Sequence, residues 1–167
     1  MLRPALPSDF GFIRALVQEN AAYLTDEDEA ALALYAAGPA TQLLIWQNPQ
    51  GLAAGFALFC GICDASGAVE LRRLALGEVG MGQGAAFLDA LIGYGFNDLA
   101  AKRLWLDASG ENLRAQRVYA RAGFTLEGRL QQHWYRPSLG RVVDVMLYGL
   151  MRDEWGPTVQ PLAAPLP

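Results

Sequence analysis

The sequence has little positive charge, and it has no long apolar run. Its 13 Lys and Arg residues are outnumbered by 17 Asp and Glu residues, so the net charge is −4 and no basic field is available to hold a nucleic acid. A membrane-spanning helix requires roughly 20 consecutive apolar residues, and no run of that length occurs. The N-terminal segment also has neither the apolar core nor the cleavage site of a signal peptide. We therefore expect a cytoplasmic protein without a nucleic-acid or membrane partner.

Cysteine and histidine are scarce. The two cysteines, Cys60 and Cys63, form a single C-x-x-C, and His133 is the only histidine. These residues are too few for a structural zinc site, which needs four ligands. A thioredoxin-like redox pair should open a helix, whereas here a turn signal follows at residues 64–67. We expect reduced thiols at the end of a strand, and no metal cofactor.

Apolar residues are plentiful. They make up 53% of the 167 residues, which is enough for one sizeable core in a chain too short for two ordinary domains. We expect a single domain over residues 1–155. Residues 156–167 form a proline-rich tail, expected to be disordered or draped over the surface.

Two helices are predicted in the N-terminal part. Apolar residues at helical spacing indicate a helix over residues 10–20, with Ser8 and Asp9 as its cap. A second helix should begin at Thr25, where Thr-Asp-Glu-Asp fits a capping box, and should end at Gly38.

Short β-rich runs, separated by turn signals, predict the strands. These runs are residues 2–5, 41–47, 51–62, 68–76, 103–108, 125–135 and 142–150. The runs from 41–47 to 68–76 should form an antiparallel meander. Because a helix over 85–96 separates 68–76 from 103–108, these two strands should be parallel and joined by a right-handed crossover. A last helix over 112–122 should end on Gly123 in the left-handed conformation.

The stretch Gly80-Met81-Gly82-Gln83-Gly84 lies between a predicted strand and a predicted helix. Its alternate glycines let backbone N–H groups at a helix N-terminus approach a phosphate, so we expect a phosphorylated cofactor. A tight turn without a ligand is the alternative. A P-loop is excluded because no Gly-Lys-Ser/Thr follows. A dinucleotide fingerprint matches the glycines, with Asp107 ending the next strand, but such a loop should follow the first strand of its fold.

Three segments in this order carry a resemblance to a known family. They are Val79 to Gly84, Asn112 to Tyr119 with the following Ala122-Gly123-Phe124, and Val143 to Leu147 with the later Glu154-Trp155. From Leu2 to Trp155 the chain resembles the GNAT N-acetyltransferases, and its second half is similar to the branch of ribosomal-protein N-terminal acetyltransferases. The resemblance implies an α/β (α+β) fold with a twisted, mainly antiparallel mixed sheet, a central parallel strand pair and helices on both faces.

The resemblance also implies that acetyl-CoA is the acyl donor. In the family, the loop amides bind the CoA pyrophosphate and the pantetheine arm lies between two separating parallel strands. Carried over to this chain, the cofactor-binding residues are Leu74, Leu76, Val79, Gly80, Met81, Gly82, Gln83, Gly84, Asn112 and Arg114. Position 79 departs from the family pattern, which has Arg or Gln there, and Glu78 adds a negative charge beside it. Asn112 fits a helix cap almost equally well.

Tyr119 and Glu70 are the expected catalytic residues. A phenol of pKa ~10 is protonated at neutral pH and can donate to a departing thiolate. The resemblance gives a tyrosine at this place that role, while ring packing in the core is the alternative. Glu70 lies on a strand where some family members carry a glutamate that deprotonates the amine through water; the alternative is a surface carboxylate paired with Arg72 or Arg73. His133 is a third candidate, as a base or substrate ligand.

The sequence therefore predicts an acetyl-CoA-dependent N-acetyltransferase, in which a primary amine attacks the thioester directly in a ternary complex. The acceptor should be a cationic or neutral amine, either a protein N-terminus or a small molecule, and the chain is compatible with a homodimer. The acidic run 26–29 is explained by the helix dipole and the capping box rather than by an acceptor site. A non-catalytic acyl-CoA-binding module on the same fold and an NAD(P)-binding oxidoreductase are the alternatives.

Overall fold

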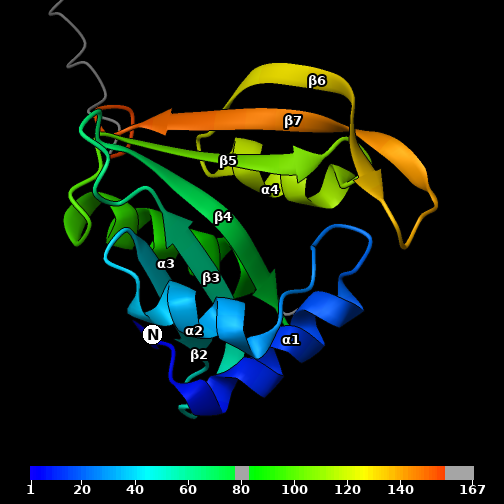
Figure 1. Cartoon of the computed structure of the whole chain (residues 1–167). Coiled ribbons are helices and arrows are strands. Elements are labelled where there is room, and N and C mark those ends of the chain that lie inside the picture. Colours follow the sequence, from blue (N-terminus) through cyan, green and yellow to red (C-terminus); the bar gives the residue numbers. More distant parts are fainter. Residues whose placement is uncertain (78–82, 157–167) are drawn as a thin grey trace, which may run out of the picture.

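Seven strands form one sheet, in the order β1-β2-β3-β4-β5-β7-β6, in the computed structural model, which describes residues 1–77 and 83–156 (Figure 1). The strands are β1 (Leu2–Pro4), β2 (Thr41–Gln47), β3 (Ala53–Cys60), β4 (Ala68–Leu76), β5 (Arg103–Ser109), β6 (Thr125–Arg136) and β7 (Arg141–Met151). The helices are α1 (Phe10–Glu19), α2 (Glu29–Ala37), α3 (Gln83–Asn97) and α4 (Leu113–Arg121), with a 3-10 turn η1 (Pro7–Asp9). The predicted order of elements is confirmed.

The strand directions also follow the prediction. Neighbouring strands are antiparallel throughout the sheet except β4 and β5, which pair in parallel over only three residue pairs, from Ala68↔Arg103 to Glu70↔Trp105. The intervening helix α3 carries the chain back to the start of β5, which is why this one pair is parallel. Beyond the third pair the two strands diverge, as Figure 1 shows.

Helices cover both faces of the sheet and divide the core in two (Figure 1). The helices α1 and α2 pack against β2 and β3, through residues such as Ile13, Leu32 and Phe56. The helices α3 and α4 pack on the opposite face, where Phe87 and Leu91 meet the inward side chains of β4 and β5. Both faces of the sheet are therefore buried in its central part.

The predicted start of the second helix at Thr25 is wrong. The helix α2 begins at Glu29, and its N-cap is Asp28, whose carboxylate accepts a hydrogen bond of 2.8 Å from the Ala31 N–H. Thr25 instead accepts a hydrogen bond of 3.2 Å from the Arg136 guanidinium. That long-range contact holds residues 20–28 as a loop, although the local pattern fits a capping box.

Asp9 occupies the predicted cap position of the first helix, but its carboxylate makes no capping hydrogen bond. Its carboxylate is used by the Arg3 guanidinium, at 2.7 and 2.8 Å, and by the Leu6 N–H at 2.7 Å. Asp9 therefore fastens strand β1 to the turn before α1, and the Arg3 guanidinium holds the pKa of this carboxyl below its usual range.

The described residues offer neither a helix long and apolar enough to cross a membrane nor a cluster of three or more metal-ligating side chains.

Replacing Asp9 should reveal this pair in the pH dependence of folding. Because the folded-state pKa of Asp9 is lowered, its stabilising effect is present above the ordinary carboxyl pKa of about 3.9 and is lost as the pH falls below it. We expect Asp9→Asn to cost on the order of 1–2 kcal/mol of unfolding free energy near neutral pH. The difference from wild type should shrink in urea titrations performed in acid.

Asp26→Asn is the matched control for this experiment. Asp26 also pairs with an arginine, Arg14, but its side chain is 40% exposed, against 10% for Asp9. Exposed ion pairs contribute little to stability, so the control should unfold nearly as the wild type does. Equal losses for both variants would contradict the role given to Asp9.

Candidate active site

A cleft of about 280 Å³ lies where β4 and β5 diverge. Beyond Glu70 and Trp105, β4 pairs only with β3 and β5 only with β7 in the described part of the chain. The facing backbone groups of the two strands are therefore available to an extended ligand. The cleft is lined by Asn20, Tyr23, Leu24, Leu71, Arg72, Arg73, Leu74, Ala75, Leu76, Gly84, Phe87, Leu88, Asp107, Ala108, Ser109, Asn112, Arg114, Ala115, Val118, Tyr119 and Trp134.

A β-bulge in β4 shapes one wall of this cleft. Leu58 of β3 pairs with Arg73 and the next residue, Phe59, pairs with Leu71, so Arg72 is the extra residue. One inserted residue changes which side chains share a face. For this reason Leu71 and Leu74, three positions apart, both join the core on the α3 side.

Five of the six predicted cofactor residues that the structure describes line this cleft. Leu74 and Leu76 line it from β4, Gly84 from the first turn of α3, and Asn112 and Arg114 from the start of α4. Gln83 is the first residue of α3 and is half-buried. The predicted cofactor residues Val79, Gly80, Met81 and Gly82, like the neighbouring Glu78, lie outside the described residues.

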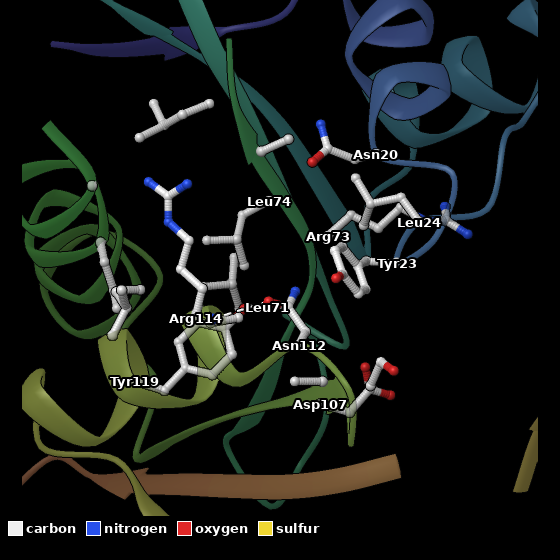
Figure 2. A pocket seen from close by; sticks show the side chains of 18 of the residues that line it. Asn20, Tyr23, Leu24, Leu71, Arg73, Leu74, Asp107, Asn112, Arg114 and Tyr119 are labelled. Atoms are coloured by element: carbon white, nitrogen blue, oxygen red, sulfur yellow. Dashed lines mark hydrogen bonds between the residues drawn. The ribbon is translucent and has the colours of Figure 1, made fainter. Parts of the chain in front are cut away.

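Asn112 serves as the N-cap of α4, which was the alternative reading of this residue. Its Oδ1 accepts a hydrogen bond of 3.1 Å from the Ala115 N–H. Since Asn112 also lines the cleft, its Nδ2 group is the donor that could contact a pantetheine amide. Arg114, two residues after Asn112, is exposed, and Figure 2 shows it near Tyr119 in that view.

Tyr119 is buried and borders the cleft. The residue is 7% exposed, and its ring packs edge-on against Tyr148 with centroids 5.7 Å apart. Burial raises the pKa of Tyr119 above its ordinary value, and the negative charge of Asp107 raises it further. The phenol therefore stays protonated at neutral pH, as a proton donor must.

Asp107 is a cleft residue that the sequence analysis did not select as a catalytic candidate, since it was considered there only as part of a dinucleotide fingerprint. It lines the cleft from β5, and in Figure 2 it lies on the side opposite Tyr119 with Asn112 between them. Burial raises the pKa of Asp107, and the nearby Glu70 adds to the rise, while Arg72, Arg73 and His133 oppose it.

Its position in the sequence offered a signal that could have been used. Asp107 alternates with Leu106 and Ala108, both buried, so it had to face away from the α4 side of β5 just where the strand leaves its parallel partner. Burying part of a carboxylate at that place costs free energy, which marks Asp107 as a candidate for a functional role.

The other predicted catalytic candidates lie apart from the cleft lining. The Glu70 carboxylate accepts hydrogen bonds from Arg72 at 2.7 and 3.0 Å, which is the ion pair considered as its alternative role. His133 is exposed, in an irregular part of β6. Both remain within electrostatic reach of Asp107.

The acidic run before α2 has structural partners. Asp26 pairs with Arg14 at 3.3 Å, Glu27 with Arg73 at 2.5 Å, and Asp28 caps α2. The expectation that helix-end effects account for the whole run is thus correct only for its last part, because two of its carboxylates are held by arginines from α1 and β4.

The end of the cleft away from α3 is formed by a loop and a hairpin strand. Asn20, Tyr23 and Leu24 come from the loop after α1, and Trp134 comes from β6. In Figure 2 the three loop residues lie on the same side as Asp107, across the cleft from Arg114. The cleft therefore has one side near α3 and α4, where the predicted cofactor residues lie, and an open side near Asp107, the loop and β6.

Comparisons with known proteins agree with this geometry. Residues 1–125 match the family described as "Acetyltransferase (GNAT) domain". A crystal structure of spermidine N-acetyltransferase from Vibrio cholerae in complex with CoA and spermine superposes with a TM-score of 0.82, at 20% sequence identity, covering 92% of this chain and 96% of that one. A dodecameric structure of spermidine N-acetyltransferase from Vibrio cholerae, in an intermediate state, gives 0.79 at 20% identity, covering 92% and 94%.

At this identity the structural likeness speaks for the fold, whereas the family match covers most of the chain. The predicted reaction class and acyl donor are thereby confirmed, and nothing in the comparisons favours the oxidoreductase or the non-catalytic module. The two structures named above are spermidine N-acetyltransferases, so they do not support the narrower resemblance to ribosomal-protein acetyltransferases. The protein belongs to the GNAT family of acetyl-CoA-dependent N-acetyltransferases.

Proposed function

We propose that this enzyme acetylates a small primary amine that carries one positive charge, with Asp107 as general base and Tyr119 as general acid. The observation that carries the proposal is the arrangement of one carboxylate and one phenol on the two sides of the cleft, at the point where β4 and β5 separate. An amine acceptor and a thioester need a proton acceptor and a proton donor, respectively, at their meeting point.

Asp107 prepares the nucleophile. The amine arrives as an ammonium ion, and it must lose one proton before its nitrogen lone pair can attack the thioester carbonyl. A carboxylate whose pKa is raised is a stronger base than an ordinary one, and burial gives Asp107 this property. Its negative charge also attracts the ammonium ion into the cleft.

Tyr119 serves the leaving group. When the carbon–sulfur bond breaks, the electron pair goes to sulfur, and the phenol gives its proton to the departing thiolate. The new amide nitrogen loses its second proton, which restores the phenol through solvent, while the proton on Asp107 is released. In sum, one ammonium ion and one thioester give one amide, one thiol and one proton.

Acetyl-CoA has a matching place in the cleft. The free facing edges of β4 and β5 offer backbone partners to an extended pantetheine arm, and Leu74 and Leu76 offer apolar contact. Arg114 lies at the N-terminal turn of α4, where its charge and the helix dipole both favour a phosphate.

The charges around the open side select the acceptor. Asp107 is the one carboxylate among the described lining residues, whereas Arg72 and Arg73 line the same side, paired with Glu70 and Glu27. Because both arginines are already neutralised by glutamates, an acceptor with several ammonium groups would find only one free counter-charge, that of Asp107. Tyr23, Leu24 and Trp134 supply an apolar and aromatic wall instead. A monoamine with an apolar or aromatic body therefore fits this side better than a polyamine does.

A three-member acceptor panel tests this proposal. We expect tyramine to exceed spermidine, and a lysine-free peptide with a free N-terminus, by roughly tenfold or more in kcat/KM, the scale of one unfavourable contact in a binding site. The measurement is thiol release from acetyl-CoA together with mass analysis of the amine. Spermidine as the best acceptor would contradict the single-charge argument, and no product from any amine would contradict the enzyme assignment.

Two finer expectations belong to this proposal. A protein N-terminus, suggested by the resemblance to ribosomal-protein acetyltransferases, is the second acceptor class, and the peptide arm of the panel tests it. The expected homodimer is tested by light scattering of the purified chain.

A further inference from the structure

Arg136, at the end of β6, is among the largest fully buried side chains of the described chain. The residue is 2% exposed, and no carboxylate pairs with it in the described part of the chain. Burial lowers the pKa of its guanidinium, which reflects the free energy of removing the charge from water. A buried cation without an ion-pair partner is costly unless hydrogen-bond acceptors surround it.

Those acceptors all come from the loop that follows α1. The Nη2 group donates to the carbonyl oxygens of Ala21 and Leu24 at 2.7 and 2.5 Å, and Nε donates to that of Ala22 at 3.1 Å. The Nη1 group donates to Thr25 Oγ1 at 3.2 Å. A planar guanidinium can hold several acceptors at fixed angles, which a lysine ammonium cannot do.

The same guanidinium lies over the ring of Trp134, 4.3 Å from its centroid. A cation over an indole face stabilises the ring in one orientation. Trp134 lines the cleft, and so do Tyr23 and Leu24, within the loop segment that Arg136 holds. One buried side chain thus fixes both the strand and the loop that border the open side of the cleft, while it does not line the cleft itself.

We propose that Arg136 is a positioning residue for the acceptor amine, joining the loop of residues 21–25 to the β6–β7 hairpin so that the acceptor wall is formed before the amine binds. This inference rests on the proposed function, because it assigns the open side of the cleft to the acceptor. It adds that acceptor affinity, but not acetyl-CoA affinity, depends on a residue outside the cleft. The cofactor side, near α3 and α4, makes no contact with Arg136 through the interactions described above.

Arg136→Lys and Arg136→Met are the test variants. The lysine keeps the charge but not the multiple fixed donors, and the methionine keeps much of the volume without charge. With tyramine as the acceptor probe, we expect KM for the amine to rise about tenfold or more in both variants, while KM for acetyl-CoA stays within about two-fold. Arg129→Met is the matched control, since Arg129 lies on the same strand but forms an exposed ion pair with Asp144. It should leave both KM values near wild type.

Hydrogen exchange separates a failure of this inference from a failure of the proposed function. If the wild type acetylates no amine, the Arg136→Lys variant should still lose amide protection in residues 20–25 and near Trp134, and nowhere else. Unchanged protection there, or equal increases of both KM values, would overturn the positioning role. A variant that unfolds more easily but keeps wild-type KM values would reduce Arg136 to a structural residue.

Discussion

Tyr119→Phe is expected to lower kcat by roughly 10- to 1000-fold, the scale of a general-acid contribution, with acetyl-CoA affinity nearly unchanged. The substitution keeps the ring, which packs against Phe124 and Tyr148, and removes only the hydroxyl. Because burial and Asp107 raise the pKa of Tyr119, its phenol holds a proton throughout the neutral range and can give it to the thiolate. Steady-state kinetics with both substrates varied measure the effect.

Tyr148→Phe is the control for this prediction. Tyr148 is an equally buried neighbour whose hydroxyl makes a long hydrogen bond of 3.4 Å to Gln116, and it is not among the residues that line the cleft. We expect its kcat to remain near wild type. Tyr119→Ala should in addition destabilise the fold by about 3–5 kcal/mol, as the loss of a buried aromatic ring does. Wild-type kcat in Tyr119→Phe would leave Tyr119 with a packing role only.

Asp107→Asn is expected to lower kcat/KM for the amine by about 10²- to 10⁴-fold. The asparagine has nearly the same shape but cannot accept a proton or attract the ammonium ion by charge. Because the pKa of Asp107 is raised, the activity of the wild type should fall in acid at a higher pH than an ordinary aspartate would give, and this limb should vanish in the variant. A pH profile of kcat/KM measures both effects.

The same substitution, Asp107→Asn, should lower activity without lowering the stability of the fold. The folded-state pKa of Asp107 lies above its unfolded value, so its favourable contribution is present below the ordinary carboxyl pKa and is lost as the pH rises through the raised pKa. Asp107→Asn should therefore be as stable as the wild type or more stable near neutral pH. Loss of both activity and stability would point to a structural role instead.

Glu70→Gln decides between the two candidate bases. Glu70 was the base expected from the sequence, and its carboxylate accepts two hydrogen bonds from the Arg72 guanidinium. We expect a much smaller loss of kcat/KM from Glu70→Gln than from Asp107→Asn. The reverse order would restore Glu70 as the base, acting through water.

Much of the fold could be predicted from local patterns. The short β-rich run at 41–47 and the helical apolar spacing at 85–96 are set by which side chains must be buried, and they correspond to β2 and α3. The parallel pairing of β4 and β5 followed from the helix between them. The glycine after α4, Gly123, has the expected left-handed φ of 98°.

What could not be predicted depends on contacts between distant parts of the chain. The local sequence around Thr25 fits a helix cap, but its hydroxyl accepts a hydrogen bond from Arg136, more than a hundred positions later in the chain. The bulge at Arg72 is set by pairing with β3 and leaves no local signal, so the direction of Glu70 and of its neighbours could not be read reliably. The role proposed for Asp107 depends on the divergence of β5 from β4 after Trp105, which the local sequence does not indicate.

The most direct test is to measure the ratio of free thiol to N-acetyltyramine formed when the enzyme reacts with acetyl-CoA and tyramine. We expect one free thiol to appear for each N-acetyltyramine formed, and both to be lost together in the Asp107→Asn/Tyr119→Phe double variant, which should still bind acetyl-CoA. Thiol released without acetylated amine, or acetyl-CoA bound with no turnover of any amine, would contradict the claim that this cleft transfers an acetyl group to an amine.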